Sequence, residues 1–197
     1  MSRGLLIVIS GPSGVGKGTV VKEFINDPDL NLTYSVSMTT RDKRPGEVDG
    51  VNYYFVTREE FEKARENGEM LETAEFVGNY YGTPLGEVEK LRNEGKNVLL
   101  EIEIQGCRQV MEKVADALTI YIVPPTMEEL ERRIRGRGTE PEEIVQERLA
   151  KAYAEMQQIG MYKYVVCNDD PVLAADIIRV IIKRHMDHGF PKKPENL

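Results

Sequence analysis

Residues 5–25 read LLIVISGPSGVGKGTVVKEFI and join three patterns without a break. The run at 5–9 is entirely apolar, which predicts a strand covered on both faces, as in the centre of a parallel sheet. A glycine-rich turn follows at 11–18, and the apolar residues of 20–25 then recur at helical spacing. The stretch therefore predicts a strand, a glycine-rich loop and a helix in direct succession.

The loop GPSGVGKGT at 11–19 contains the Gly-x4-Gly-Lys core of a P-loop. Its glycines let backbone N–H groups turn inward around a β-phosphate, and Lys17 would neutralise the β and γ oxygens. The strict pattern places Ser or Thr after the lysine to reach Mg²⁺, whereas here Gly18 follows it and Thr19 comes one later. The loop predicts these ATP-binding residues: Gly11, Pro12, Ser13, Gly14, Val15, Gly16, Lys17, Gly18 and Thr19.

Strand patterns recur along the rest of the chain, mostly separated by helical patterns. They lie at 33–37, 97–104, 117–123 and 164–167. This alternation favours an α/β fold with a parallel sheet flanked by helices.

Residues 38–90 break the alternation, because short strand patterns surround a helical pattern at 57–68. We therefore predict a small α+β subdomain at 38–90 and a P-loop core made of 1–37 and 91–197.

An arginine-rich helical segment follows the fourth predicted strand, from Met127 to Gln158, with a loop at 136–143. Phosphoryl transfer needs alignment and positive charge where the transferring oxygens develop negative charge. We therefore expect residues of about 126–150 to form a helical lid of the core. A last helix is predicted from about Pro171 to His188.

The composition opposes several classes of partner. Lys plus Arg (26) against Asp plus Glu (33) gives a formal charge of -7, which disfavours adhesion to nucleic acid or anionic lipid. No segment approaches a transmembrane span or a signal peptide. The two cysteines, Cys107 and Cys167, lie in or beside apolar segments, which favours buried thiols in a reducing compartment. We predict a cytoplasmic location without nucleic acid or membrane partners, and the sequence leaves the oligomeric state open.

A second cluster of motifs, together with the P-loop, resembles the guanylate kinase family over about residues 4–185. The motifs are GPSGVGKG, the S-x-S-x-T-T-R-x-x-R-x-G-E track from Ser35, N-Y-Y-G, E-I-x-x-Q-G, a Pro-Pro pair, G-R-G-T and V-x-N-D-D. The resemblance implies a P-loop NTPase fold and transfer of the γ-phosphoryl group of ATP to GMP. The products would be ADP and GDP, and Mg²⁺ would accompany ATP.

The residues of the second cluster suit GMP chemically. Arg41 and Arg44 lie three apart, and two guanidinium groups can bind a monophosphate dianion by charge-assisted hydrogen bonds. The hydroxyls of Tyr53 and Tyr81 would assist. Glu72 could accept both the N1–H and the 2-amino group of guanine, whereas adenine lacks that amino group and presents a lone pair at N1.

The resemblance assigns the remaining roles. Glu103 stands where the family usually has Asp near the base, and Glu101 would orient magnesium-bound water at the end of the strand. Asn168 matches a segment near the adenine of ATP. The predicted GMP-binding residues are Ser37, Arg41, Arg44, Tyr53, Glu72, Tyr81, Thr83 and Glu103. The predicted catalytic residues are Lys17, Arg41, Arg133, Arg137 and Arg148.

Two alternatives stay open at this point. Another nucleoside monophosphate kinase is possible because Gly-Lys-Gly-Thr also occurs in the adenylate kinase family, although Glu72 and the paired arginines argue against AMP. A kinase-derived scaffold domain would bind a protein partner without catalysis. Such domains typically lose the P-loop, which is intact here.

Overall fold

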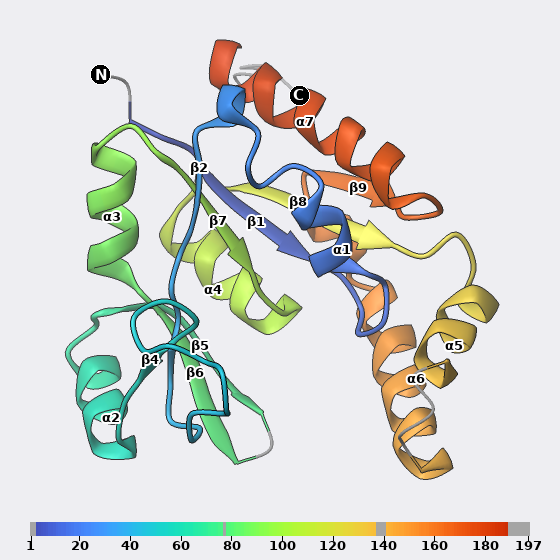
Figure 1. Cartoon of the computed structure of the whole chain (residues 1–197), viewed down its shortest axis with the longest axis horizontal. Coiled ribbons are helices and arrows are strands. Elements are labelled where there is room, and N and C mark those ends of the chain that lie inside the picture. The colour runs from blue at the N-terminus through green and yellow to red at the C-terminus, as the bar shows by residue number, and fades with distance from the viewer. Residues whose placement is uncertain (1–2, 77, 137–140, 189–197) are drawn as a thin grey trace. The chain divides into compact units, whose positions relative to one another are not determined.

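The computed structural model describes residues 3–76, 78–136 and 141–188. The chain divides into two compact units (Figure 1). The first contains the residues up to Val8 and Thr33–Ala117, and the second contains Ile9–Leu32 and the residues from Leu118. The predicted subdomain at 38–90 lies within the first unit, and its boundaries stay a prediction.

The first unit contains most of the strands. Its elements are β1 (Leu6–Ser10, which continues into the second unit), β2 (Leu32–Tyr34, which starts in the second unit), β3 (Met38–Thr39), β4 (Tyr54–Phe55), α2 (Arg58–Glu66), β5 (Met70–Phe76), β6 (Asn79–Pro84), α3 (Leu85–Asn93), β7 (Asn97–Glu101) and α4 (Ile104–Lys113).

Strands β2, β7 and β1 are hydrogen-bonded in that order, and the arrows of β1 and β7 point the same way in Figure 1. Every residue of β1 is buried, as are Asn97 to Leu100 of β7. The apolar run after Gly4 therefore forms the buried strand that its composition predicts. Arg92 on α3 fixes the start of this strand, since its guanidinium donates to the Gly4 carbonyl at 2.9 Å and to Asp116 at 2.7 Å.

A separate four-stranded sheet has the order β4-β3-β6-β5, and α2 lies beside it (Figure 1). Strands β5 and β6 are antiparallel, with Glu72 opposite Thr83. The register shifts between Met70 and Glu72, which marks a β-bulge, a feature that can re-aim a side chain. Phe61 of α2 packs in the small core here and stacks on Tyr80, with ring centroids 5.4 Å apart.

The second unit contains the P-loop and most of the helices. Its elements are α1 (Lys17–Lys22), a 3-10 turn (Pro28–Leu30), β8 (Leu118–Val123), α5 (Met127–Arg135), α6 (Glu142–Met156), a second 3-10 turn (Ile159–Met161), β9 (Tyr164–Cys167) and α7 (Pro171–His188). Strands β8 and β9 pair in parallel, from Ile120 opposite Tyr164 to Val123 opposite Cys167. The predicted helix at 171–188 is confirmed.

Several sequence predictions need correction. The helix after the P-loop ends at Lys22 rather than near Ile25, and Asp27 is extended before Pro28, as residues before proline prefer. The strand predicted at 97–104 ends at Glu101, because α4 begins at Ile104 and buries Ile104, Cys107 and Val110 at helical spacing. The strand predicted at 33–37 ends at Tyr34. Cys107 is buried as predicted, whereas Cys167 is exposed.

Across the described residues, no helix combines the length and apolar composition that a membrane span requires.

Helix α2 begins with a capping box that its sequence T-R-E-E encodes. The Glu60 backbone N–H donates to the Thr57 hydroxyl at 3.2 Å, and the Thr57 N–H donates to the Glu60 carboxylate at 2.8 Å. We expect Thr57→Ala to lower the free energy of unfolding by about 1 kcal/mol, because two helix N-terminal donors lose this arrangement. Urea denaturation checks this, with Thr57→Ser as the control that keeps the hydroxyl. Equal stability of the two variants would contradict it.

Candidate functional site

The P-loop of the second unit depends on glycine at two positions. Gly14 and Gly16 have φ values of 87° and 92°, a region that L side chains rarely adopt. A Cβ at Gly14 would lie 2.7 Å from Cγ1 of Ile134, and a Cβ at Gly16 would lie 2.8 Å from Nδ2 of Asn168. Other side chains must therefore approach this backbone closely, and only glycine allows it.

Lys17 lies at the first position of α1, directly after this turn. Its ammonium group donates to the Gly11 carbonyl at 2.6 Å and to the Pro12 carbonyl at 3.4 Å. The side chain thus folds back over the loop that the sequence assigns to phosphate. Gly18 is partly buried and Thr19 is exposed.

Three predicted residues from distant parts of the second unit meet at this loop. Arg133 on α5 donates to the carbonyls of Val15 at 3.3 Å and Asn168 at 3.0 Å. Arg148 on α6 donates to the Ser13 hydroxyl at 2.7 Å. Asn168, which follows β9 and is 3% exposed, donates from Nδ2 to the same Val15 carbonyl at 2.7 Å. Asn168 therefore supports the loop backbone directly.

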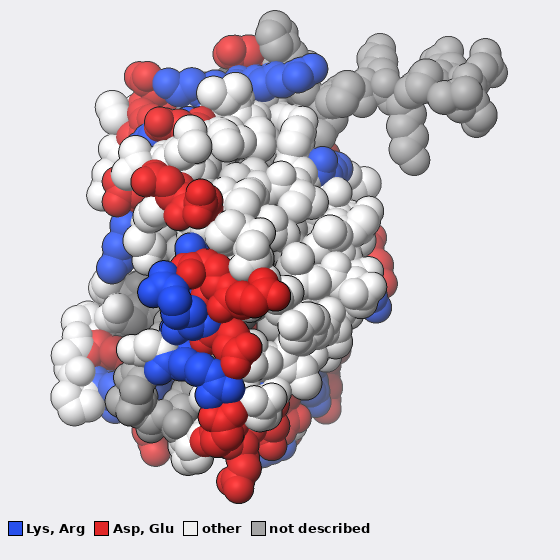
Figure 2. Space-filling view, turned by 90° about the vertical axis from the view of Figure 1, so that its right-hand side faces the viewer, with Lys and Arg blue, Asp and Glu red and all other residues white. Residues whose placement is uncertain are grey.

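Basic and acidic side chains alternate over α5 and α6, as Figure 2 shows. Glu129 accepts from Arg132 and Arg133 at 2.7 Å each, and these hydrogen bonds lower the pKa of Glu129 to about 2. Arg135 pairs with Glu131 and Glu142. Arg132 and Arg135 thus have acidic partners on these helices, and no nucleotide role was predicted for them. The predicted catalytic Arg137 lies outside the described residues.

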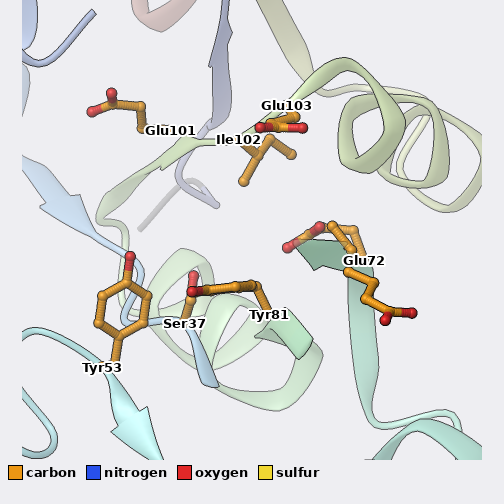
Figure 3. Close-up of a pocket in the computed structure, with 9 residues that line it drawn as sticks. Ser37, Tyr53, Glu72, Tyr81, Glu101, Ile102 and Glu103 are labelled. Carbon is orange, nitrogen blue, oxygen red and sulfur yellow. The ribbon is translucent and has the colours of Figure 1, made fainter. Parts of the chain in front are cut away.

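The first unit contains a cavity of about 310 Å³, lined by Ser37, Tyr53, Glu72, Ala74, Glu75, Tyr81, Glu101, Ile102 and Glu103. Figure 3 shows Glu72 and Glu103 on one side and Tyr53, Ser37 and Tyr81 on the other. The structure therefore brings together most of the residues predicted to bind GMP, although they come from β5, β6 and the segments next to β3, β4 and β7.

Glu72 is a buried carboxylate, with 4% of its surface exposed. Thr83, opposite it on β6 and fully buried, donates its hydroxyl to Oε1 at 2.7 Å. Burial raises the pKa of Glu72, while the Thr83 hydrogen bond and the charge of Lys113 act in the opposite direction. Thr83 therefore contacts the proposed base-binding carboxylate.

Arg41 has an acidic partner that the sequence analysis did not predict. Its guanidinium forms two hydrogen bonds to Glu47, at 2.8 and 3.1 Å, and lies 5.5 Å from the ring centroid of Tyr53. The Arg44 backbone N–H also donates to Glu47 at 2.8 Å, while the Arg44 side chain is exposed. The ring of Tyr53 meets that of Tyr81 edge-on at 6.0 Å. Glu47 thus orders the predicted phosphate-binding segment.

Glu101 and Glu103 extend to different sides of Ile102 in Figure 3, although both line the cavity. In a regular strand residues 101 and 103 would point to the same side, but Glu103 lies beyond the end of β7, at the residue before α4. Glu101 also lines an adjoining cavity of about 350 Å³, together with Tyr34 and Asn52. Burial and the nearby Glu101 raise the pKa of Tyr34 to about 12.

The chain matches known proteins over most of its length. The family model described as guanylate kinase matches residues 3–184. A curated guanylate kinase from Enterococcus faecalis is 55% identical over 180 residues, which covers 91% of this chain and 88% of the relative. A second, from Streptococcus pyogenes serotype M3, is 54% identical over 181 residues, which covers 92% and 86% respectively.

The solved structure of guanylate kinase from Anaplasma phagocytophilum has a TM-score of 0.72 to this chain. It is 37% identical and covers 93% of this chain and 87% of its own. This likeness confirms the predicted α/β P-loop NTPase fold. With a family model and relatives above half identity that agree over most of the chain, this protein belongs to the guanylate kinase family.

Proposed function

We propose that this member of a nucleoside monophosphate kinase family transfers the γ-phosphoryl group of ATP to GMP, giving ADP and GDP. The observation that carries the choice of GMP is the buried Glu72 carboxylate, held by Thr83 in the cavity of the first unit. ATP would bind at the P-loop of the second unit. A cytoplasmic location stays a prediction from the sequence.

Recognition of guanine follows from the donor pattern of the base. The Oε1 atom of Glu72 already accepts one hydrogen bond from Thr83, and a carboxylate offers about four acceptor positions in all. It can therefore accept the N1–H and the 2-amino group of guanine as well. Adenine would leave this buried charge without those donors, and an unpaired buried charge is costly. Ser37 and Glu103, on the same cavity, are proposed to contact the rest of the base.

The phosphate of GMP is proposed to bind Arg41, Arg44, Tyr53 and Tyr81. A dianion offers the Arg41 fork the same planar acceptor pair that Glu47 offers now. The GMP phosphate would thus replace the Glu47 carboxylate as the partner of Arg41. This dianion is also the nucleophile, and because it is ionised near neutral pH the transfer needs no general base.

The ATP site is proposed to act mainly through charge and alignment. Lys17 and the P-loop N–H groups would hold the β- and γ-phosphates, and Arg133 and Arg148 lie within reach of the loop. In an in-line transfer, negative charge spreads over the oxygens of the moving phosphoryl group, so several cations around it lower the barrier. Arg137 is proposed to join them.

The donor groups fit a magnesium ion that arrives with ATP. Mg²⁺ usually keeps several waters and takes one or two carboxylates together with substrate phosphates. In the described part of the chain, no three Asp, Glu, His or Cys side chains gather as a metal cage. Glu101, exposed at the end of β7, is proposed to orient metal-bound water. When bound, the ion would neutralise charge on the β and γ oxygens.

The direct test measures ADP production from MgATP with GMP, AMP, CMP or UMP as acceptor, beside a control without acceptor. We expect turnover with GMP and at least about a hundredfold lower kcat/KM with AMP, since a polar site rejects an analogue that leaves its groups unpaired. Preference for AMP would overturn the proposed reading of Glu72. If folded protein that binds nucleotide shows no turnover with any of the four acceptors, the proposed activity is refuted.

Replacing Lys17 with Met should reduce kcat by about a hundredfold or more, because it removes positive charge from the transferring phosphates. Lys22 is an exposed lysine at the end of the same helix, so Lys22→Met is the matched control and should keep normal turnover. Steady-state kinetics with saturating GMP compare the two. Near-normal turnover of Lys17→Met would remove Lys17 from the mechanism.

Glu72→Gln should weaken the use of GMP by about 1–3 kcal/mol, because a charged acceptor becomes a neutral amide. The same change should stabilise the fold at neutral pH. The pKa of Glu72 is raised above its ordinary 4.5 in the folded protein, so folding loses stability as pH rises from that value through the raised pKa. The variant lacks this loss.

Two measurements check the Glu72 prediction, with exposed Glu66→Gln as the control. The ratio of kcat/KM for GMP over AMP should fall in Glu72→Gln alone. In urea denaturation, its stability advantage over the wild type should grow as pH rises above about 4.5. An unchanged GMP-over-AMP ratio would refute the proposal that Glu72 recognises guanine. A stability difference that does not change with pH would refute the argument that Glu72 is a buried charge.

A further inference from the structure

Helix α4 contacts β5 on the side of the strand that carries no further strand in the four-stranded sheet. An edge strand leaves backbone N–H and C=O groups that need other partners. Gly106, Gln109 and Lys113 are spaced by three and four residues, so they share one face of α4. Each of the three lies against β5 or the side chain of Glu72.

Gln109 and Lys113 bind the β5 backbone on both sides of Glu72. The Gln109 amide donates to the Thr73 carbonyl at 2.7 Å and accepts from the Thr73 N–H at 3.0 Å. One side-chain amide thus replaces the peptide group that a neighbouring strand would provide. Lys113 donates to the Met70 carbonyl at 2.8 Å. The backbone is therefore held at 70 and 73, across the β-bulge that precedes Glu72.

Gly106 provides the space for the Glu72 carboxylate itself. A Cβ at position 106 would lie 2.5 Å from Oε2, 3.2 Å from Cδ of Glu72 and 3.3 Å from Cδ1 of Ile102. Real Cβ atoms essentially never come within 3.0 Å of such an atom, so Oε2 of the carboxylate would have to move. It cannot move freely, because Thr83 holds the other oxygen and the group is 4% exposed.

Glycine is also an unfavourable residue within a helix, where alanine is the best. Gly106 is the third residue of α4 and is buried. Helix formation therefore does not explain the glycine at position 106. The Glu72 carboxylate explains it, because that group occupies the space that a Cβ would need.

We propose that Gly106, Gln109 and Lys113 form a positioning face on α4 that determines guanine specificity by fixing where the Glu72 carboxylate lies. This inference rests on the proposed reading of guanine by Glu72. Two hydrogen bonds to adjacent donors of one base require a fixed carboxylate position, and a displacement of about 1 Å can cost about a hundredfold in rate.

The test compares Gly106→Ala with Gly86→Ala, another glycine near the start of a helix, in the whole enzyme. A Cβ at Gly86 meets nothing within 4 Å, so this control should leave kinetics unchanged. Gly106→Ala should raise KM for GMP and lower the GMP-over-AMP ratio of kcat/KM by about tenfold or more. KM for ATP should stay within about twofold, since the P-loop belongs to the other unit.

A double-mutant cycle separates positioning from a general loss of structure. Glu72→Asp shortens the side chain and withdraws its carboxylate from position 106, so Gly106→Ala should cost less in the Glu72→Asp background than in the wild type. Gln109→Ala should lower the ratio in the same direction, and it serves if Gly106→Ala fails to fold. Additive effects in the cycle, or an unchanged ratio in folded variants, would overturn the proposal.

The Glu72→Gln variant distinguishes failure of the positioning proposal from failure of the proposed recognition of guanine by Glu72. If Glu72→Gln loses discrimination while Gly106→Ala and Gln109→Ala keep it, the positioning face is wrong and the proposed function stands. If Glu72→Gln keeps discrimination, Glu72 does not read the base, and the positioning proposal fails with it.

Discussion

The Glu72 carboxylate is a charged group that the protein keeps almost wholly out of water. Burial of a charge is unfavourable unless hydrogen bonds and opposite charges offset it, and here the Thr83 hydroxyl and the charge of Lys113 do so in part. The pairing of β5 with β6 meets part of this need. The register shift in β5 lies directly before Glu72, and β6 places Thr83 opposite.

The P-loop imposes a comparable constraint on the second unit, through backbone rather than charge. Gly14 and Gly16 adopt positive φ and let Ile134 and Asn168 approach within distances that a Cβ would not allow. The Val15 carbonyl then receives donors from α5 and from the segment after β9. A loop that contacts neighbouring elements on several sides can hold its N–H groups in place before a phosphate arrives, which is what electrostatic catalysis requires.

The sequence was sufficient where one local pattern determines the outcome. The apolar run before Ser10, the helical pattern after Val56 and the helix from Pro171 all appear as their residues predict. It failed at Ile102–Ile104, which follow the end of β7, because packing of the α4 face favours a helix from Ile104.

The site divides in the same way. Motif residues such as Ser37, Tyr53 and Glu72 line one cavity, as a family resemblance can predict. The partnership of Arg41 with Glu47 and the contact of Gly106 with Glu72 depend on three-dimensional proximity. In the second case the residues lie far apart in sequence, and a glycine carries no chemical group that would point to a role. The E-I-x-x-Q-G motif includes Gly106, but the motif alone does not reveal which side chain lies against that glycine.

Three of the arginines proposed to bind phosphate have side-chain partners in the protein. Arg41 is bound to Glu47, Arg133 to Glu129 and Arg148 to Ser13. Binding of a nucleotide would therefore exchange one charge-assisted hydrogen bond for another, so the net gain depends on geometry rather than on charge alone. A flexible or misplaced anion gains little from such an exchange, whereas a phosphate that is positioned by its base gains fully. The formal charge of -7 predicts weak binding of polyanions in general, and such an exchange would favour a positioned phosphate further.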